Sequence, residues 1–389
     1  MPDRIYLDHA ATTPVDPRVL AAMIPYYQNA WGNPSGIYME AQRARRGLDE
    51  AREQVAGLLE CLPAEIIFTS GGTESDNLAL RGALASRSEL GRHVISTPIE
   101  HHAVLHTLEA IKRAGCDVTL IPVDSEGFVE PAAVQAALRE DTALVTIMAA
   151  NNEVGTLQPI AEIARAVKER NPHTLVHTDA VQAAGVLDIR PDILGVDLIS
   201  LTAHKIYGPK GIGLLYVRRR TELEPQILGG SQERERRAGT ENVAGAVAFA
   251  TALELAIRER EQHSDHVRRL RDNLWLDLRE RIDGLHLNGP VDFDRRLPNN
   301  LSLCFSGVEG ESILLQLDMA GIAASSGSAC STGSTEPSHV LTAMGVDSDL
   351  AHAAVRLSFG AENDDSHVDR VAAELPQVID RLRSLSPVA

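Results

Sequence analysis

The chain has 389 residues, of which 44% are hydrophobic and 23% are charged, a composition typical of folded globular proteins. Its 54 acidic residues outnumber its 37 basic ones, and the net charge of −17 argues against a protein that binds nucleic-acid backbones. No stretch is apolar over enough residues to cross a bilayer, and the N-terminal residues lack the apolar segment of a secretory signal. We therefore expect a cytoplasmic protein of two domains that binds neither nucleic acid nor membranes.

The chain has four cysteines, namely Cys61, Cys116, Cys304 and Cys330. They are widely dispersed, without a C-x-x-C pair, which fits neither a disulfide framework nor a structural zinc site. We expect a reducing compartment and no intrinsic metal. Three of the cysteines lie in or beside apolar patterns and are expected to pack, whereas Cys330 lies in "SSGSACSTG", a loop of small polar residues where a free thiol is unusual.

Beyond residue 65, short apolar runs alternate with stretches of helical pattern. The runs are "EIIFTS" (65–70), "HVIST" (93–97), "DVTLIPV" (117–123), "ALVTIMA" (143–149), "LVHTDA" (175–180), "DLISLT" (197–202) and "GIGLLYV" (211–217). Helical patterns run to about residue 90, begin near residues 102 and 131, and cover 160–170. Continuous apolar strands alternating with helices predict an α/β fold with a mainly parallel sheet that is covered on both faces.

A long helical pattern with a charged, solvated face covers residues 243–281 and bridges to a second region. In that region, strand patterns at 285–289, 299–305 and 353–360 mix with helical patterns at 310–321, 337–345 and 366–385 without simple alternation. This order predicts a smaller α+β domain. We expect the large domain to cover residues 15–257 and the small domain to comprise 1–14 and 258–389, with a mobile cysteine loop at about 324–335.

In α/β sheets, ligands bind beyond the carboxyl ends of the strands. After "IIFTS" comes Gly71-Gly72-Thr73-Glu74 and then a helix, so small residues and free N–H groups together offer a seat for a phosphate. The alternative is an ordinary glycine turn with Thr73 as the helix N-cap.

Two further strands end in groups that pyridoxal phosphate requires. Asp179 follows "LVHT", and Lys205 follows "DLISLT" in "TAHKIYGPKG". A lysine forms the Schiff base with this cofactor and a carboxylate keeps its pyridine nitrogen protonated. We expect burial in a semi-apolar run to lower the pKa of Lys205. Either residue alone could equally belong to a structural ion pair.

Seven motifs in this order resemble the cysteine desulfurases of the nitrogen-fixation and iron–sulfur assembly type, which are pyridoxal-phosphate enzymes of the class V aminotransferase family. The motifs are "YLDHAATTPVDPRV" (6–19), "IIFTSGGTESDNLAL" (66–80), "NNEVGTLQPI" (151–160), "HTDAVQ" (177–182), "HKIYGPKGIG" (204–213), "RAGTEN" (237–242) and "SSGSACSTGSTEPSHVL" (325–341). The resemblance covers residues 6–385 and implies a large domain with a mainly parallel seven-stranded sheet.

Carried over to this chain, the resemblance implies a set of cofactor contacts. Lys205 would form the Schiff base, Asp179 would face the pyridine nitrogen, Gln182 the phenolic oxygen and His101 the ring, where it could also move protons. The phosphate would be held by Gly72, Thr73, Thr202 and His204, with Thr240 from the second subunit of a homodimer. Asn152 would contact the cofactor and, with Arg356 and Asn33, the substrate carboxylate. Where the family has Ser-Gly, this chain has Thr202-Ala203, which keeps the hydroxyl for the phosphate.

The resemblance also implies the reaction. L-cysteine would lose its sulfur to the thiolate of Cys330, giving L-alanine and a persulfide that passes to an acceptor protein, such as an iron–sulfur scaffold. Whether Cys330 also ligates a cluster within a complex stays open. The chain stops soon after residue 385, so we expect no docking of a scaffold through the C-terminal extension of assembly-type members.

Three alternative functions stay open. Another class V enzyme, such as a selenocysteine lyase, kynureninase-like hydrolase or aminotransferase, would not need Cys330 in its loop. A non-catalytic sulfur carrier on the same fold would not need Lys205. A thiol hydrolase that pairs Cys330 with a histidine leaves Asp179 and Lys205 without a purpose.

Overall fold

The computed structural model describes residues 4–87, 89, 91–326 and 336–385. Its largest element is a seven-stranded sheet in the order β2-β8-β7-β6-β5-β3-β4. The strands are β2 (Ile66–Thr69), β3 (His93–Ser96), β4 (Asp117–Leu120), β5 (Thr142–Thr146), β6 (Leu175–Asp179), β7 (Leu198–Thr202) and β8 (Gly213–Val217). All neighbours pair in parallel except at β8, which is antiparallel to both β2 and β7. The predicted fold class is confirmed.

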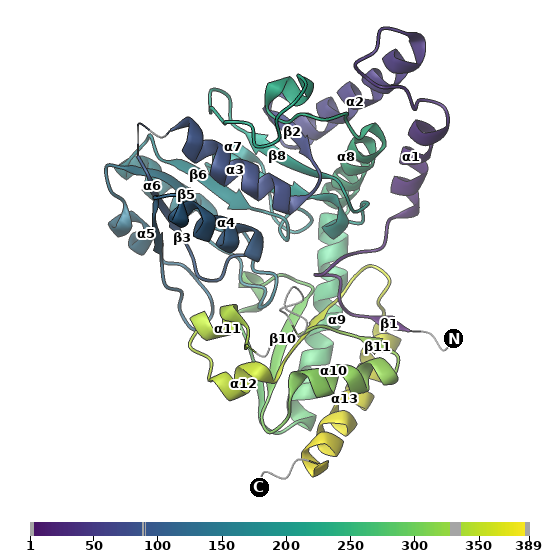
Figure 1. The fold of residues 1–389 in the computed structure, drawn as a ribbon. Helices are drawn as coiled ribbons and strands as arrows, with labels where there is room; N and C mark the ends of the chain where they lie inside the picture. Colours follow the sequence, from purple (N-terminus) through teal and green to yellow (C-terminus); the bar gives the residue numbers. More distant parts are fainter. Residues whose placement is uncertain (1–3, 88, 90, 327–335, 386–389) are drawn as a thin grey trace.

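Helices cover both faces of this sheet (Figure 1). The strand residues alternate between two apolar clusters: Ile67, Val94 and Leu144 pack with α3 and α4, whereas Phe68 and Val145 pack on the opposite face. This alternation follows from the period of two in a strand. The helices of this part are α1 (Pro17–Gln28), α2 (Met39–Leu58), α3 (Gly72–Ser86), α4 (His102–Arg113), α5 (Pro131–Ala137), α6 (Ile160–Arg170), α7 (Pro191–Leu194) and α8 (Val243–Arg258).

A second apolar core lies below the large sheet in Figure 1. It contains a three-stranded antiparallel sheet in the order β12-β10-β9 and a two-stranded parallel sheet of β1 and β11. These strands are β1 (Ile5–Tyr6), β9 (Leu285–Leu287), β10 (Asn300–Phe305), β11 (Ile322–Ala323) and β12 (Ala354–Ser358). The helices are α9 (Arg260–Arg281), α10 (Gly310–Met319), α11 (His339–Ala343), α12 (Ser348–His352) and α13 (Asp365–Leu385). The apolar cores of the two parts are separate clusters, and the domain limits given above stay a prediction.

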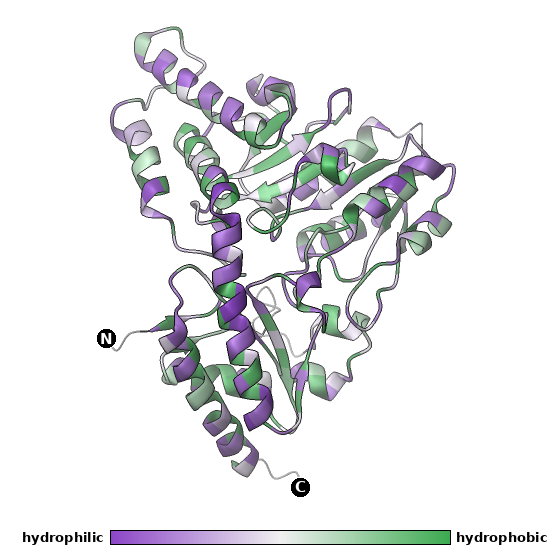
Figure 2. Ribbon diagram, turned by 180° about the vertical axis from the view of Figure 1, so that it is seen from behind, coloured by the Kyte–Doolittle hydropathy of each residue, from purple (hydrophilic) through white to green (hydrophobic). Residues whose placement is uncertain are grey.

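The predicted single helix over 243–281 is wrong in one respect: it is two helices, α8 and α9, that meet at Glu259. Glu259 has φ −99° and ψ 7°, outside regular helical values, and its carboxylate accepts from both terminal nitrogens of Arg18. A contact distant in sequence therefore accompanies the break. Figure 2 shows that α9 turns a hydrophilic outer surface away from the small core, as its charged pattern predicts.

Candidate active site

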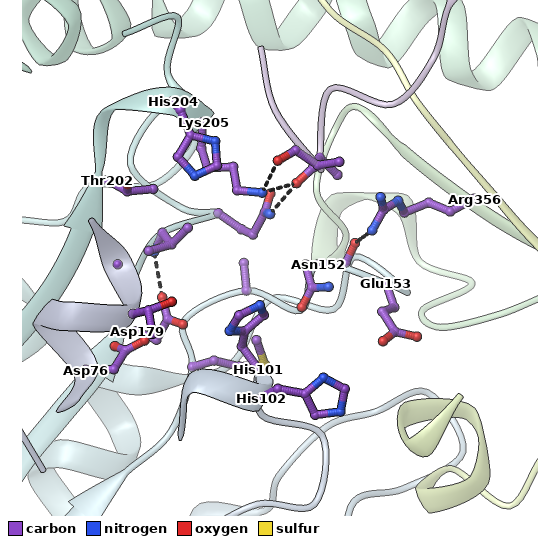
Figure 3. Close-up of a pocket in the computed structure, with 18 of the residues that line it drawn as sticks. Asp76, His101, His102, Asn152, Glu153, Asp179, Thr202, His204, Lys205 and Arg356 are labelled. Atoms are coloured by element: carbon purple, nitrogen blue, oxygen red, sulfur yellow. Dashed lines mark hydrogen bonds between the residues drawn. The ribbon is translucent and has the colours of Figure 1, made fainter. Parts of the chain in front are cut away.

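A cavity of about 250 Å³ lies between the carboxyl edge of the large sheet and the smaller core (Figure 3). Ten of the residues predicted from the sequence line it. They are Gly72, Thr73, His101, Asn152, Asp179, Gln182, Thr202, His204, Lys205 and Arg356. The strand ends of β6 and β7 and the first turn of α3 meet here because parallel strands end at the same edge.

The amine of Lys205 lies at the N-terminal segment of the chain. Its Nζ donates to the carbonyl oxygens of Ala10 and Ala11, at 2.5 and 2.6 Å. The amide of Gln182 donates to the same Ala10 carbonyl at 2.9 Å. Lys205 stands in the short 3-10 turn of residues 203–205 that follows β7 directly. Two carbonyls therefore hold the amine of Lys205 in the cavity (Figure 3), and one of them also accepts from Gln182.

Asp179 is the last residue of β6, and only 6% of it is exposed. Its Oδ1 accepts from the backbone N–H of Val181 at 2.9 Å. Burial raises the pKa of Asp179 to about 6, while the Val181 N–H and the Lys205 amine act in the opposite direction. A buried carboxylate with this partial compensation is suited to pair with a cationic ring nitrogen in the cavity.

His101 is the N-cap of α4, where its Nδ1 accepts from the N–H of Ala103 at 3.1 Å. Burial, and then the charges of Lys205 and three neighbouring histidines, together lower the pKa of His101 to about 4. The imidazole is therefore neutral at pH 7, and because Nδ1 accepts, its proton lies on Nε2. Figure 3 shows the ring pointing into the cavity.

The first turn of α3 forms one end of the cavity. Its N-cap is Gly71, which has no side chain to accept from the N–H groups of that turn, so the alternative of Thr73 as the cap is wrong. A Cβ on Gly72 would lie 2.9 Å from Cγ2 of Val181, so the space beside this turn depends on glycine. Thr202 and His204 line the same region. Uncapped N–H groups at a helix N-terminus bind anions.

Arg356 enters the cavity from β12 although only 1% of it is exposed. Its Nη1 donates to the backbone oxygen of Asn152 at 2.8 Å and its Nη2 to Oδ1 of Asp8 at 2.6 Å. These partners fix the plane of the guanidinium. An arginine held in this way at a cavity wall is suited to bind a carboxylate.

Cys330 lies outside the described residues, and so does most of the segment predicted to be a mobile loop. The described residues on either side of this segment meet cavity residues. Before it, Ser325 exchanges backbone hydrogen bonds with Arg356, at 3.2 and 2.6 Å. After it, Oγ of Ser338 donates to Oε2 of Glu153 at 2.5 Å. Both ends of the segment that carries Cys330 are therefore anchored at the cavity.

Two predicted site residues do not line the cavity. Asn33 is exposed, and its side chain accepts from the N–H of Ser35 instead. Thr240, which we expect to act across a dimer, is also exposed. A single chain does not bring either residue to the site.

Several acidic and histidine residues at the site were not predicted from the sequence. Asp76, Glu153 and His339 line the cavity, and Glu100 lies fully buried beside His101. The sequence pattern could have identified Asp76 as a buried residue. The helical period places it on one helix face with Ala79, Leu80 and Ala83, which are all buried. An acid on an apolar helix face signals a buried carboxyl. Glu100 and Glu153 lie in irregular segments and give no such signal.

The three described cysteines are free, and burial raises the pKa of each thiol, to about 12 for Cys61 and about 11 for Cys304. They are poorly suited to act as nucleophiles. Within the described part of the chain, no group of three or more His, Cys, Asp or Glu side chains could hold a metal ion. Among the helices that the structure describes, none has the length and apolarity to span a membrane.

Residues 5–371 match the aminotransferase class-V family. The chain is 46% identical over 387 residues to "Cysteine desulfurase IscS" of Dictyoglomus turgidum, with 100% of this chain and 97% of that relative covered. Its fold is similar to a solved NifS-like protein, with a TM-score of 0.92, 40% identity, and 98% of this chain and 100% of that chain covered. It is also similar to "SspA in complex with cysteine", with a TM-score of 0.81, 35% identity, and 92% and 99% covered. The chain therefore belongs to the aminotransferase class-V family and, within it, to the cysteine desulfurases.

Proposed function

We infer that this enzyme uses pyridoxal phosphate to remove sulfur from L-cysteine, giving L-alanine and a persulfide on Cys330. The observation that carries this inference is the meeting of the Lys205 amine and the Asp179 carboxyl in one cavity, at the ends of the adjacent parallel strands β6 and β7. Relatives named as cysteine desulfurases and a related structure described as a complex with cysteine support the choice of substrate.

The residues present fit this cofactor. A phosphate fits beside the first turn of α3, where the N-cap offers no side chain and a Cβ on Gly72 would fill the space. Asp179 would pair with the ring nitrogen, Gln182 would donate to the phenolic oxygen, and Lys205 would hold the aldehyde carbon. When bound, pyridoxal phosphate draws electrons away from the α-carbon of an amino acid. Thr202 and His204 would complete the phosphate site.

The other cavity residues would hold the substrate and move its protons. The buried guanidinium of Arg356 would bind the carboxylate of L-cysteine together with Asn152. The released amine of Lys205 would take the α-proton. His101 would stack on the ring, and since it is neutral its Nε2–H can donate a proton and then accept one.

Sulfur transfer would need the thiolate of Cys330. Its Sγ would attack the sulfur of the substrate: a sulfur–sulfur bond forms, the Cβ–sulfur bond breaks, and its electron pair stays with carbon, which takes up a proton as alanine forms. Cys330 is four residues beyond Ser326, so the chain can reach at most about 14 Å from there. Ser325 is hydrogen-bonded through its backbone to Arg356, the residue that would bind the substrate carboxylate. The substrate site is therefore within that reach.

The test is a direct assay of the persulfide. We expect the purified protein to be yellow and to produce alanine from L-cysteine, with one extra sulfur on Cys330 detected by mass spectrometry of its peptide. Cys330→Ala should keep the visible absorbance and lose sulfur transfer, whereas Cys116→Ala, a matched control away from the cavity, should keep both. Normal sulfide and alanine production by Cys330→Ala would contradict the assignment.

The proposal extends to a homodimer with a sulfur-acceptor protein as partner, acting in the cytoplasm. Thr240 is exposed in the single chain, as expected of a residue that serves the other subunit. Large apolar side chains are also exposed in the segment between α1 and α2, where Trp31 is 66% and Ile37 is 90% exposed. A monomer in analytical ultracentrifugation with full cofactor occupancy would contradict the dimer.

A further inference from the structure

Three carboxyl side chains are buried at the cavity, and two of them, Asp76 and Asp179, line it. Asp76 of α3, Glu100 before α4 and Asp179 at the end of β6 are 1%, 0% and 6% exposed. The carboxyl groups of Asp76 and Asp179 lie near each other in Figure 3, and the charge of Asp179 acts on Asp76. In the described part of the chain, no Lys or Arg lies within ion-pair distance of Asp76 or Glu100. Three negative charges in such a site would repel each other at high cost.

The nearest candidate for a counter-charge to Asp76 is His177, whose Nε2 lies 3.7 Å from Oδ1 of Asp76. Both nitrogens of His177 already have hydroxyl partners, in Thr146 at 2.8 Å and Ser200 at 3.0 Å. Burial lowers the pKa of His177 to about 3, so the ring is neutral. His177 cannot neutralise a charge on Asp76, and Oδ1 of Asp76 has no hydrogen-bond partner.

Asp179 is better placed to carry a charge than its neighbours. It accepts from the Val181 N–H, and the Lys205 amine lowers its pKa. Glu100 accepts from Thr97 and the Met148 N–H through Oε1 only, and its Oε2 has no partner. Burial, and then the charge of Asp179, raises the pKa of Asp76 well above its usual value, although the Ser200 hydroxyl lowers it in part. Two adjacent buried carboxyls that share a proton are a known arrangement.

We propose that Asp76 and Asp179 carry one negative charge between them, with the proton on Asp76, and that Asp76 is a positioning residue that keeps this charge on Asp179. The proposal deepens the proposed function on which its significance rests, because a pyridine nitrogen would then face a single carboxylate. The location of the proton is a property of the protein alone and does not depend on the cofactor.

Infrared absorption tests the proton directly, because a carboxylic acid and a carboxylate have separate carbonyl bands. In the full-length chain freed of cofactor at pH 7.5, Asp76→Asn should remove one acid band. Asp265→Asn, which changes a carboxyl that is 75% exposed on α9, should remove none. Identical acid bands in wild type and Asp76→Asn would overturn the proposal.

Asp179→Asn provides a second measurement in case Asp76→Asn does not fold. Without the charge of Asp179, Asp76 should lose its proton more easily, so its acid band should disappear at a pH at least one unit lower than in wild type. An unchanged midpoint would overturn the sharing of one charge. Glu100→Gln serves to subtract the band of the third carboxyl.

Cofactor titration by visible absorbance separates this proposal from the proposed function. An amide mimics a protonated acid, so Asp76→Asn should weaken pyridoxal phosphate binding only slightly. The fold-increase in the dissociation constant should be at least five times larger for Asp179→Asn than for Asp76→Asn. Equal losses would place charge on Asp76 and overturn the proposal. If wild-type protein binds no pyridoxal phosphate, the proposed function fails, while the infrared result still decides where the proton lies.

Discussion

The two walls of the cavity are built in different ways. On the large-sheet side, the functional groups stand at or just beyond strand ends: Asp179 closes β6, Thr202 closes β7 and Lys205 follows in the next turn. On the other side, Arg356 projects from β12 and is oriented by Asp8. The Cys330 segment is anchored to that wall through Ser325, whereas Ser338 donates to Glu153, which follows β5 of the large sheet. The sheet edge thus provides fixed groups for the cofactor, and the smaller core provides groups for substrate and sulfur.

The largest effect should come from the sheet-edge wall, at Lys205. Lys205→Ala removes the amine that binds the cofactor and takes the α-proton, so we expect desulfurase activity to fall at least about 1,000-fold. Absorbance should also lose the signature of a protein-bound cofactor. Lys112→Ala, at the exposed end of α4, is the control. Retained activity in Lys205→Ala would contradict the assignment of this wall.

The buried carboxyl of Glu100 tests the same wall through the pH dependence of the free energy of unfolding. Burial raises its pKa to about 8, so the folded protein keeps a proton that the unfolded chain releases near pH 4.5. The folding free energy from this group is fully present below pH 4.5 and is lost as pH rises towards 8, by about 1.4 kcal/mol per pH unit. The free energy of unfolding, measured with denaturant, should therefore fall as pH rises. Glu100→Gln should make this fall less steep, because Asp76 and Asp179 also have raised pKa values, whereas Glu109→Gln, on the exposed side of α4, should leave it unchanged. If the free energy of unfolding depended on pH equally in Glu100→Gln and in wild type, Glu100 would not be a buried acid that keeps its proton.

Arg356 tests the opposite wall. Lysine keeps the charge but loses the planar pair of donors, so Arg356→Lys should lower kcat/KM for L-cysteine about 10- to 100-fold, mainly through KM. Cofactor absorbance should change little. Arg296→Lys, another buried arginine outside the cavity, separates loss of stability from loss of binding. A change confined to kcat would argue against carboxylate binding.

The smallest effect should come from the anchor beyond Cys330. Ser338 caps α11 by accepting from the N–H groups of Val340 and Leu341 and also donates to Glu153. Ser338→Ala should lower the free energy of unfolding by about 1–2 kcal/mol. Ser384→Ala, exposed near the end of α13, should change it by less than about 0.5 kcal/mol. If persulfide formation in Ser338→Ala slows more than the loss of stability explains, the hydrogen bond from Ser338 to Glu153 also positions the segment that carries Cys330.

Much of the sheet-edge wall could be predicted, because buried parallel strands read as continuous apolar runs and the residues after them are few. Asp179, Thr202 and Lys205 stand out for this reason. The antiparallel β8 follows β7 after a turn through Gly211, at φ +82°, which is too short for the crossover that a parallel strand requires. The break at Glu259 has no Gly or Pro to signal it, and the partner that bonds it there, Arg18, is distant in sequence.

The buried acids are the part that sequence patterns describe least well. An acidic residue usually faces solvent, so Glu100 and Glu153 appear as ordinary surface charges. Their burial depends on Met148 and Ser338, which come from other elements. Asn33 and Thr240 show the opposite limit, since the family resemblance implies a role for each and the single chain leaves both exposed. Local sequence patterns therefore identify the reactive side chains more readily than the tertiary contacts that decide whether a carboxyl is buried and charged.

The N-terminal segment has a consequence for the order of folding. Its carbonyls hold Lys205, and its strand β1 pairs with β11. The Ala10 N–H donates to Ser358, 348 residues further along the chain. At roughly 5–20 residues per second, a ribosome makes Ser358 roughly 17–70 s after it makes Ala10. The N-terminal segment must therefore dock late, and the amine of Lys205 reaches its final position only after Ser358 has been made.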